Sequence, residues 1–238
     1  MTNWSAFNTT KHVVESTAWG LMSSTNVLHP ETKLISIHQV PKQVPIFSTI
    51  LPQHVELNEY LKHVILEHRQ NNPTTLQSNV KAWHSSWITH QENPKFQPLV
   101  DLTLQACKFI SAGYYECETY YKVINMWAMM YEDTEWTKRH SHFPSDFAAC
   151  YYVDVEQGSA PIIFESVVND GVNHNNQPLT IQPQNGMLAI WDAMLHHEVP
   201  PTKGKRMAIS MNIDKGSRYH VEQKEMGNES TRTIWKTF

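Results

Sequence analysis

Three histidines and one arginine in the C-terminal half have the types and spacing of a metal site beside an anion-binding site. His140 and His142 are separated by one residue, and His197 follows a short apolar run. Arg206 begins another apolar stretch nine residues after His197. Imidazole is a common ligand of transition metals, and a buried guanidinium needs an anion such as a carboxylate. Together these residues predict a metal ion held next to a molecule that carries a carboxylate.

The spacing of His140 and His142 allows both to reach one metal. If their segment is extended, both side chains lie on the same face, because side chains alternate along a strand with a period of two. The alternative, for this pair and for His196-His197, is a set of solvated loop histidines. The joint occurrence of both motifs next to apolar strands favours the metal site.

Arg206 begins a strand whose two faces differ. Its core face is predicted to hold four large apolar side chains, while the face of Arg206 holds small and polar ones, as expected of a strand that lines a wet cavity. The first set is Met207, Ile209, Met211 and Ile213, and the second is Arg206, Ala208, Ser210 and Asn212. An ion pair between Arg206 and a nearby carboxylate is the alternative to a bound anion.

The elements that position these residues are mainly short β-strands preceded by two helices. Apolar residues at intervals of three to four predict helices over residues 55–70 and about 98–113, and residues 71–98 are expected to form a long loop with one strand at most. Residues 1–50 are expected to form short strands and loops. After residue 118, β-branched and aromatic runs separated by turn residues predict strands at 121–130, 148–155, 161–168, 179–183, 187–192 and 206–214.

Several short strands without intervening helices indicate an antiparallel sandwich, and the two helices are expected to pack outside it. We therefore predict a mainly β fold with flanking helices, a jelly roll, in a single domain. Residues 1–43 would be an extension, 44–118 a support of helices and loops, 119–214 the jelly-roll core and 215–238 a tail.

Composition excludes several classes of protein. The formal net charge is −4 and no stretch clusters Lys and Arg, which argues against a nucleic-acid partner. The apolar runs are too short to span a bilayer, so no membrane partner is expected. The chain begins without a basic segment followed by an apolar one, and its three cysteines lack C-x-x-C spacing. These features predict a cytoplasmic protein without a disulfide framework.

The C-terminal half resembles the 2-oxoglutarate/Fe(II)-dependent dioxygenase superfamily. It is most similar to the 2OG-Fe(II) oxygenase family common in bacteria and phages, and more distantly to prolyl-hydroxylase-like enzymes; if a phage encodes the chain, its location would be the host cytoplasm. The resemblance covers roughly residues 44–214. It rests on residues 44–47, the segment from Trp127, and residues 140–145, 149–153, 186–191 and 197–212.

The resemblance implies a double-stranded β-helix that uses Fe(II), 2-oxoglutarate and O₂. In it His140 and His197 would ligate iron, and Arg206 would pair with the distal carboxylate of 2-oxoglutarate, assisted by Tyr152 and Ser210. The sequence departs from the superfamily at one position, because His142 stands where a carboxylate is usual. We favour His142 as the third ligand, since the closer family also has His-x-His, and keep Asp146 as the alternative.

The predicted activity is hydroxylation of an unidentified substrate coupled to decarboxylation of 2-oxoglutarate to succinate. The substrate would be a small molecule or a protein side chain. One alternative is a cupin-like oxygenase with an all-histidine metal site that does not use 2-oxoglutarate. Another is a non-catalytic jelly-roll protein with a binding or structural role. The sequence leaves the substrate and the oligomeric state open.

Overall fold

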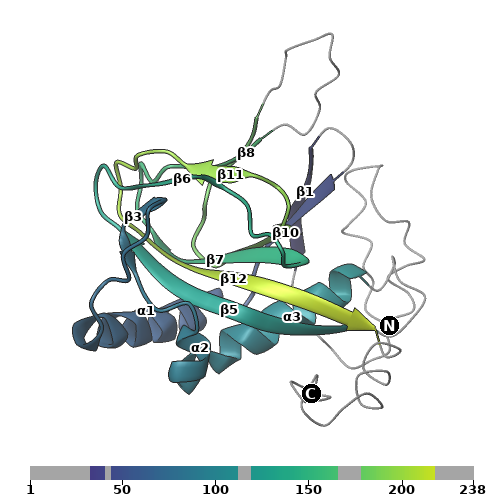
Figure 1. Ribbon diagram of the computed structural model, residues 1–238, viewed down its shortest axis with the longest axis horizontal. Coiled ribbons are helices and arrows are strands. Elements are labelled where there is room, and N and C mark those ends of the chain that lie inside the picture. Colours follow the sequence, from purple (N-terminus) through teal and green to yellow (C-terminus); the bar gives the residue numbers. More distant parts are fainter. Residues whose placement is uncertain (1–32, 41–43, 112–118, 166–177, 218–238) are drawn as a thin grey trace.

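The protein is a sandwich of two antiparallel β-sheets with helices on one side. The computed structural model describes residues 33–40, 44–111, 119–165 and 178–217. Figure 1 shows the smaller sheet above the larger one and the helices below the larger sheet. This arrangement confirms the predicted mainly β sandwich with flanking helices.

The larger sheet has seven strands and the smaller has five, with all neighbouring strands antiparallel. In spatial order the larger sheet contains β1 (Lys33–Val40), β2 (Val44–Ile50), β10 (Met187–Asp192), β7 (Phe147–Val155), β12 (Arg206–Ser217), β5 (Thr119–Tyr131) and β4 (Trp83–His84). The smaller sheet contains β3 (Val80–Lys81), β6 (Trp136–His140), β11 (His197–Val199), β8 (Ile162–Phe164) and β9 (Leu179–Ile181).

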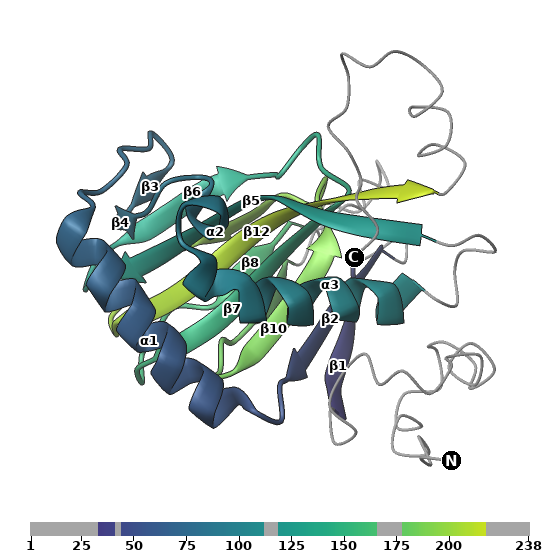
Figure 2. The same cartoon turned by 90° about the horizontal axis from the view of Figure 1, so that it is seen from below.

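The helices cover the outer face of the larger sheet, as the view from below shows (Figure 2). They are α1 (His54–Asn71), α2 (Thr89–Glu92), a 3₁₀ turn η2 (Pro94–Phe96) and α3 (Gln97–Ser111). In α1 the spacing of Leu57, Leu61 and Val64 places them on one face, and all three are buried in the core below the sheet. No helix in the described part of the chain is long and apolar enough to cross a membrane.

Strand β12 separates the helix-covered core from the space between the sheets. Met207, Ile209, Met211 and Ile213 belong to the core shared with the helices. Arg206, Ala208, Ser210 and Asn212 line a cavity on the opposite face. The predicted division of this strand into an apolar core face and a cavity-lining face is therefore confirmed.

The predicted helices and most predicted strands occur with ends shifted by a few residues, which is ordinary for pattern-based boundaries. The strand predicted at 161–168 is three residues long, and positions 166–168 lie outside the described residues. Two strands of the smaller sheet, β6 and β11, were not predicted as strands. The segment 71–98, expected to be a loop, contains β3, β4, α2 and η2.

The larger sheet includes residues both before and after the range 119–214 that the sequence predicted as the jelly-roll core. Strands β1 and β2 pair with each other, and β2 pairs with β10, so the larger sheet includes residues before position 51. Strand β12 continues to Ser217. Residues 1–32 and 218–238 of the predicted extension and tail lie outside the described residues.

Gly186, at the turn into β10, provides a test of the packing between this turn and α1. Its φ of +78° lies in the left-handed region, and a Cβ there would lie 2.2 Å from the Cβ of His54. We expect Gly186→Ala to lower the free energy of unfolding by about 2–4 kcal/mol, as the sum of backbone strain and overpacking. Urea unfolding monitored by tryptophan fluorescence measures this loss.

Gly158→Ala is the matched control. Gly158 also has a positive φ, +90°, but a Cβ there would meet its nearest heavy atom at 3.7 Å, an ordinary contact. Only the backbone cost of about 1–2 kcal/mol is expected. Equal losses in the two variants would contradict the packing argument.

Candidate metal centre

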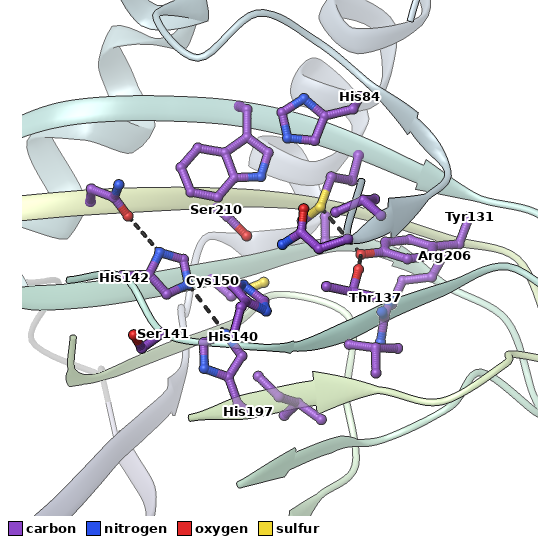
Figure 3. Close-up of a pocket in the computed structure, with 18 of the residues that line it drawn as sticks. His84, Tyr131, Thr137, His140, Ser141, His142, Cys150, His197, Arg206 and Ser210 are labelled. Carbon is purple, nitrogen blue, oxygen red and sulfur yellow. Dashed lines mark hydrogen bonds between the residues drawn. The ribbon is translucent and has the colours of Figure 1, made fainter. Parts of the chain in front are cut away.

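Three histidines converge at the end of the smaller sheet. His140 is the last residue of β6, and His197, the first residue of β11, is its direct partner in the antiparallel register. His142 lies just beyond β6, where its backbone N–H donates to the Ala193 carbonyl at 2.8 Å. One nitrogen of each imidazole lies within 4.8 Å of the others. Figure 3 shows the three rings pointing toward one another from these segments.

Hydrogen bonds fix which nitrogen of each ring faces the centre. Nδ1 of His140 donates to the Lys138 carbonyl at 2.9 Å, and Nδ1 of His197 donates to the Leu195 carbonyl at 3.0 Å. Nδ1 of His142 donates to Oδ1 of Asn212 at 2.5 Å. Because each Nδ1 carries the proton, each neutral ring keeps an unprotonated Nε2, and such partners are typical of metal-binding histidines.

The distances fit a bound metal ion. Nε2 of His142 and Nε2 of His197 are 3.2 Å apart. Because both Nδ1 atoms are protonated, each of these Nε2 atoms carries a lone pair and no proton lies between them. The two lone pairs repel each other unless a cation lies between them. A metal–nitrogen distance of about 2.1 Å and ordinary coordination angles place two ligand nitrogens roughly 3.0–3.4 Å apart. His142 and His197 therefore fit ligands of one metal ion, and the ligand nitrogen of His140 lies within 4.8 Å of both.

Burial keeps the rings in the neutral form that a metal requires. Loss of solvent lowers the pKa of His140, and the same cause lowers the pKa of His142 to about 4. His197 is 4% exposed, and burial holds its pKa well below the ordinary value. Since imidazole coordinates metals only when neutral, all three ligands would be available at pH 7.

Arg206 supplies a buried positive charge on the same cavity. Its side chain is 3% exposed, and its guanidinium lies 4.4 Å from the centre of the Tyr131 ring and 5.8 Å from that of Tyr152. Nη1 donates to the Ala160 carbonyl at 3.0 Å, while Nε has no hydrogen-bond partner. No ion pair joins Arg206 to a carboxylate among the described residues. The alternative of an internal ion pair is thus wrong for this part of the chain, and the guanidinium can accept an external anion.

The histidines and Arg206 line one cavity of about 250 Å³ between the sheets. Figure 3 shows Arg206 beside Tyr131 and away from the histidine cluster. Tyr131 closes the Arg206 end, and its hydroxyl lies 2.6 Å from Oγ1 of Thr137. Such a cavity, with an anion-binding group at one end and metal ligands at the other, suits a small molecule held at two points.

The structure brings most of the residues predicted from the sequence to this cavity. His140, His142, His197, Arg206, Tyr152 and Ser210 all line it. Asp146, the alternative third ligand, does not join the histidine group. Its carboxylate accepts from the backbone N–H of Lys215 at 2.8 Å and lies 3.6 Å from the Lys215 ammonium, which anchors the end of β12.

Sequence reasoning did not assign roles to Tyr131, Thr137, Asn212 or His84. A signal existed for Asn212, because alternation placed it on the face of Arg206, and for Tyr131, because Trp127, Met129 and Tyr131 alternate along β5. All three of these β5 residues line the cavity. His84 had no such signal, since β4 is two residues long.

Comparison with known families supports this geometry. Residues 125–214 match the family described as "Putative 2OG-Fe(II) oxygenase". The resemblance inferred from the sequence is thereby confirmed. The match runs from β5 to β12 and contains the three histidines and Arg206. The cofactors named by this family are Fe(II) and 2-oxoglutarate, which agree with the donor set and the buried guanidinium.

Solved structures with the same fold include a prolyl hydroxylase, a carbocyclase and a protein with 2-oxoglutarate bound. A Pseudomonas putida prolyl-4-hydroxylase matches with a TM-score of 0.53 and 14% identity, over 71% of this chain and 91% of that one. A non-haem α-ketoglutarate-dependent carbocyclase of nogalamycin biosynthesis matches with a TM-score of 0.56 and 10% identity, over 76% of this chain and 85% of that one. HygX from Streptomyces hygroscopicus, solved with nickel and 2-oxoglutarate, matches with a TM-score of 0.51 and 8% identity, over 71% of this chain and 82% of that one.

At these low identities the structural similarity shows the fold alone, and it confirms the predicted double-stranded β-helix. No curated protein sequence matches the chain significantly.

Removing one histidine tests the metal centre. We expect His197→Ala to weaken binding of Co(II), a spectroscopic substitute for Fe(II), by on the order of 100-fold or more, because one of three nitrogen ligands is lost. His196→Ala, at the exposed neighbouring position, should bind like the wild type. Visible absorption titration measures both, and equal affinities would contradict the assignment.

The metal-free protein should lose stability as the pH falls from 6.5 to about 4. Above this range His142 is neutral in both the folded and the unfolded chain. Within it, the unfolded chain takes up a proton that the folded chain does not, because the folded pKa is about 4 instead of 6.5. For this one residue the free energy of unfolding should fall by roughly 3 kcal/mol across the range.

His142→Gln isolates this contribution because glutamine does not titrate. Urea unfolding at pH 7, 6, 5 and 4, with a chelator present, should give a flatter pH dependence for this variant than for the wild type. His63→Gln, at an exposed position on α1, is the control for replacing a histidine. Identical slopes in His142→Gln and the wild type would contradict the burial argument.

Proposed function

We propose that this protein is an Fe(II)- and 2-oxoglutarate-dependent dioxygenase that hydroxylates a substrate while converting 2-oxoglutarate to succinate and CO₂. One observation carries the proposal: three converging imidazoles and a buried guanidinium without a carboxylate partner line the same cavity. The family match over residues 125–214 supports it.

His140, His142 and His197 would hold the metal through their Nε2 atoms. Three protein ligands leave coordination positions open to small molecules, as in other oxygenase sites with few protein ligands. When bound, Fe(II) and 2-oxoglutarate supply the oxidation of a C–H bond by O₂. The protein holds the rings in one tautomer through the three Nδ1 hydrogen bonds and keeps water out with the surrounding aromatic side chains.

Arg206 would bind the distal carboxylate of 2-oxoglutarate. Its guanidinium lies over the rings of Tyr131 and Tyr152, which restrict where the group can move. The bond from Nη1 to the Ala160 carbonyl leaves the other donors for a carboxylate. Ser210 lies two residues after Ala208 on the same face of β12 and adds a hydroxyl to this wall of the cavity.

The charges balance differently from those of a site with two histidines and one carboxylate. Three neutral imidazoles contribute no negative charge, so the two positive charges of Fe(II) are balanced only by what binds to it. Dianionic 2-oxoglutarate supplies two negative charges, and Arg206 adds one positive charge. We therefore expect the metal and 2-oxoglutarate to strengthen each other's binding.

Succinate formation from 2-oxoglutarate with Fe(II) and ascorbate tests the function. Arg206→Ala should raise the KM for 2-oxoglutarate by on the order of 100-fold, because a buried charge-assisted pair is lost. Lys205→Ala, at the exposed neighbouring position, should keep the wild-type KM. Proton NMR follows both succinate and remaining 2-oxoglutarate.

Succinate formation, oxygen consumption and metal binding, measured together, separate the alternatives. A wild-type protein that binds Fe(II) but neither binds 2-oxoglutarate nor turns it over would contradict the proposal. Metal-dependent oxygen consumption that is independent of 2-oxoglutarate and of Arg206 would indicate the cupin-like oxygenase. Absence of any metal binding at pH 7 would indicate a non-catalytic protein.

A further inference from the structure

His84 lines the same cavity and carries a buried hydrogen-bond acceptor without a partner. It is not one of the three candidate metal ligands. The residue lies in β4 and is 1% exposed. It is the direct partner of Met129 in β5, so both side chains project from the same face of the sheet. Both line the cavity. Figure 3 shows His84 across the cavity from His197.

The orientation of the His84 ring is fixed. Nδ1 lies 2.6 Å from the Ser85 carbonyl and must therefore donate to it. The backbone is held on both sides, since its N–H donates to Oγ1 of Thr74 and its carbonyl accepts from the Thr75 N–H at 2.7 Å. The ring also stacks on Trp127 at 5.7 Å between centres.

Nε2 of His84 is left as a buried acceptor without a hydrogen-bond partner. Burial also lowers the pKa of His84, which favours the neutral ring with a free lone pair on Nε2. A buried polar atom without a partner costs free energy, and in a cavity wall such an atom suits recognition of a ligand. Trp87, whose ring centre lies 4.8 Å from that of His84, also lines the cavity and is 38% exposed.

The charge of the cavity wall restricts the ligand further. Arg206 is the one lining residue with a permanent charge, and no Asp, Glu or Lys lines the cavity among the described residues. The exposed lining residues Trp87 and Phe143, the latter 70% exposed, are aromatic. Such a wall favours an uncharged molecule with a planar or apolar body.

We propose that His84 determines substrate specificity by accepting a hydrogen bond at Nε2 from an O–H or N–H group of an uncharged, aromatic or otherwise planar substrate packed against Trp87. The proposal rests on the proposed function, because it takes this cavity to be the place where the substrate is oxidised. His84 is remote from the metal ligands in sequence, and Trp127 stacks on both His84 and His142.

Phenol and fluorobenzene are suitable probes, because they are similar in size and only phenol carries a donor. Ligand-observed NMR titration of the metal-free protein should give phenol about 2- to 10-fold tighter binding than fluorobenzene, the range for one hydrogen bond. His84→Phe keeps an aromatic ring and should abolish the difference, whereas His84→Gln keeps an acceptor and should retain part of it. Trp87→Ala should weaken both probes equally.

A second measurement uses the wild type alone. In protein labelled with ¹⁵N-histidine, the Nε2 resonance of His84 should shift on adding phenol and stay unchanged with fluorobenzene. The assignment would be overturned by equal affinities for the two probes or by no detectable binding of either. It would also be overturned by an unchanged preference for phenol in His84→Phe or by a His84 Nε2 resonance that does not shift. Selective phenol binding without succinate formation would support a ligand site at His84 and contradict the proposed function. Succinate formation without selective phenol binding would support the proposed function and contradict the site at His84.

Discussion

The site depends on the register in which β11 pairs with β6. That register places His197 opposite His140, and the chain just beyond β6 brings His142 to the same point. A slip of one residue would turn the His197 side chain to the other face of the sheet, because side chains alternate. The pairing of His197 with Phe164 in β8 on the other side holds β11 in place. The three ligands thus come from two strands and one loop whose relative position is set by backbone hydrogen bonds.

The helices allow β12 to carry polar residues on its cavity face. Strand β12 lies between β5 and β7 and can place polar residues on one face only if its other face is buried elsewhere. Helices α1 and α3 provide that burial through the core that includes Ile209 and Met211. The cavity face of β12 is therefore free to carry Arg206 and Asn212, which serve the anion and His142 respectively. Although far from the metal centre in sequence, the helices are a condition for it.

Periodicity predicted the parts of the fold that follow from local pattern. The two faces of β12 and the helix over residues 55–70 repeat over enough residues to identify both the element and its buried side. Strands β6 and β11 carry ligands but offer little pattern, because β11 has three residues and β6 has polar residues on the exposed side. Their strand character comes from pairing with each other, which is a property of the tertiary structure.

The same limit explains which site residues were found. His140, His142, His197 and Arg206 are recognisable by residue type and spacing. Asp146 was a reasonable alternative ligand by proximity in sequence, but its carboxylate binds Lys215. His84 comes from the edge strand β4, whose pairing with β5 spans a long stretch of chain, so neither spacing nor alternation could place it in the cavity.

Burial has opposite consequences for the two kinds of positively chargeable group in this cavity. A histidine can lose its proton, so desolvation of His142 and His197 produces neutral rings with lone pairs ready for a metal. Arginine keeps its proton in proteins, so desolvation of Arg206 produces instead a requirement for an anion. The apolar shell of aromatic side chains around the cavity thus generates both halves of the site at once. A more solvated cavity would weaken both, because protons would compete for the histidines and water would satisfy the guanidinium.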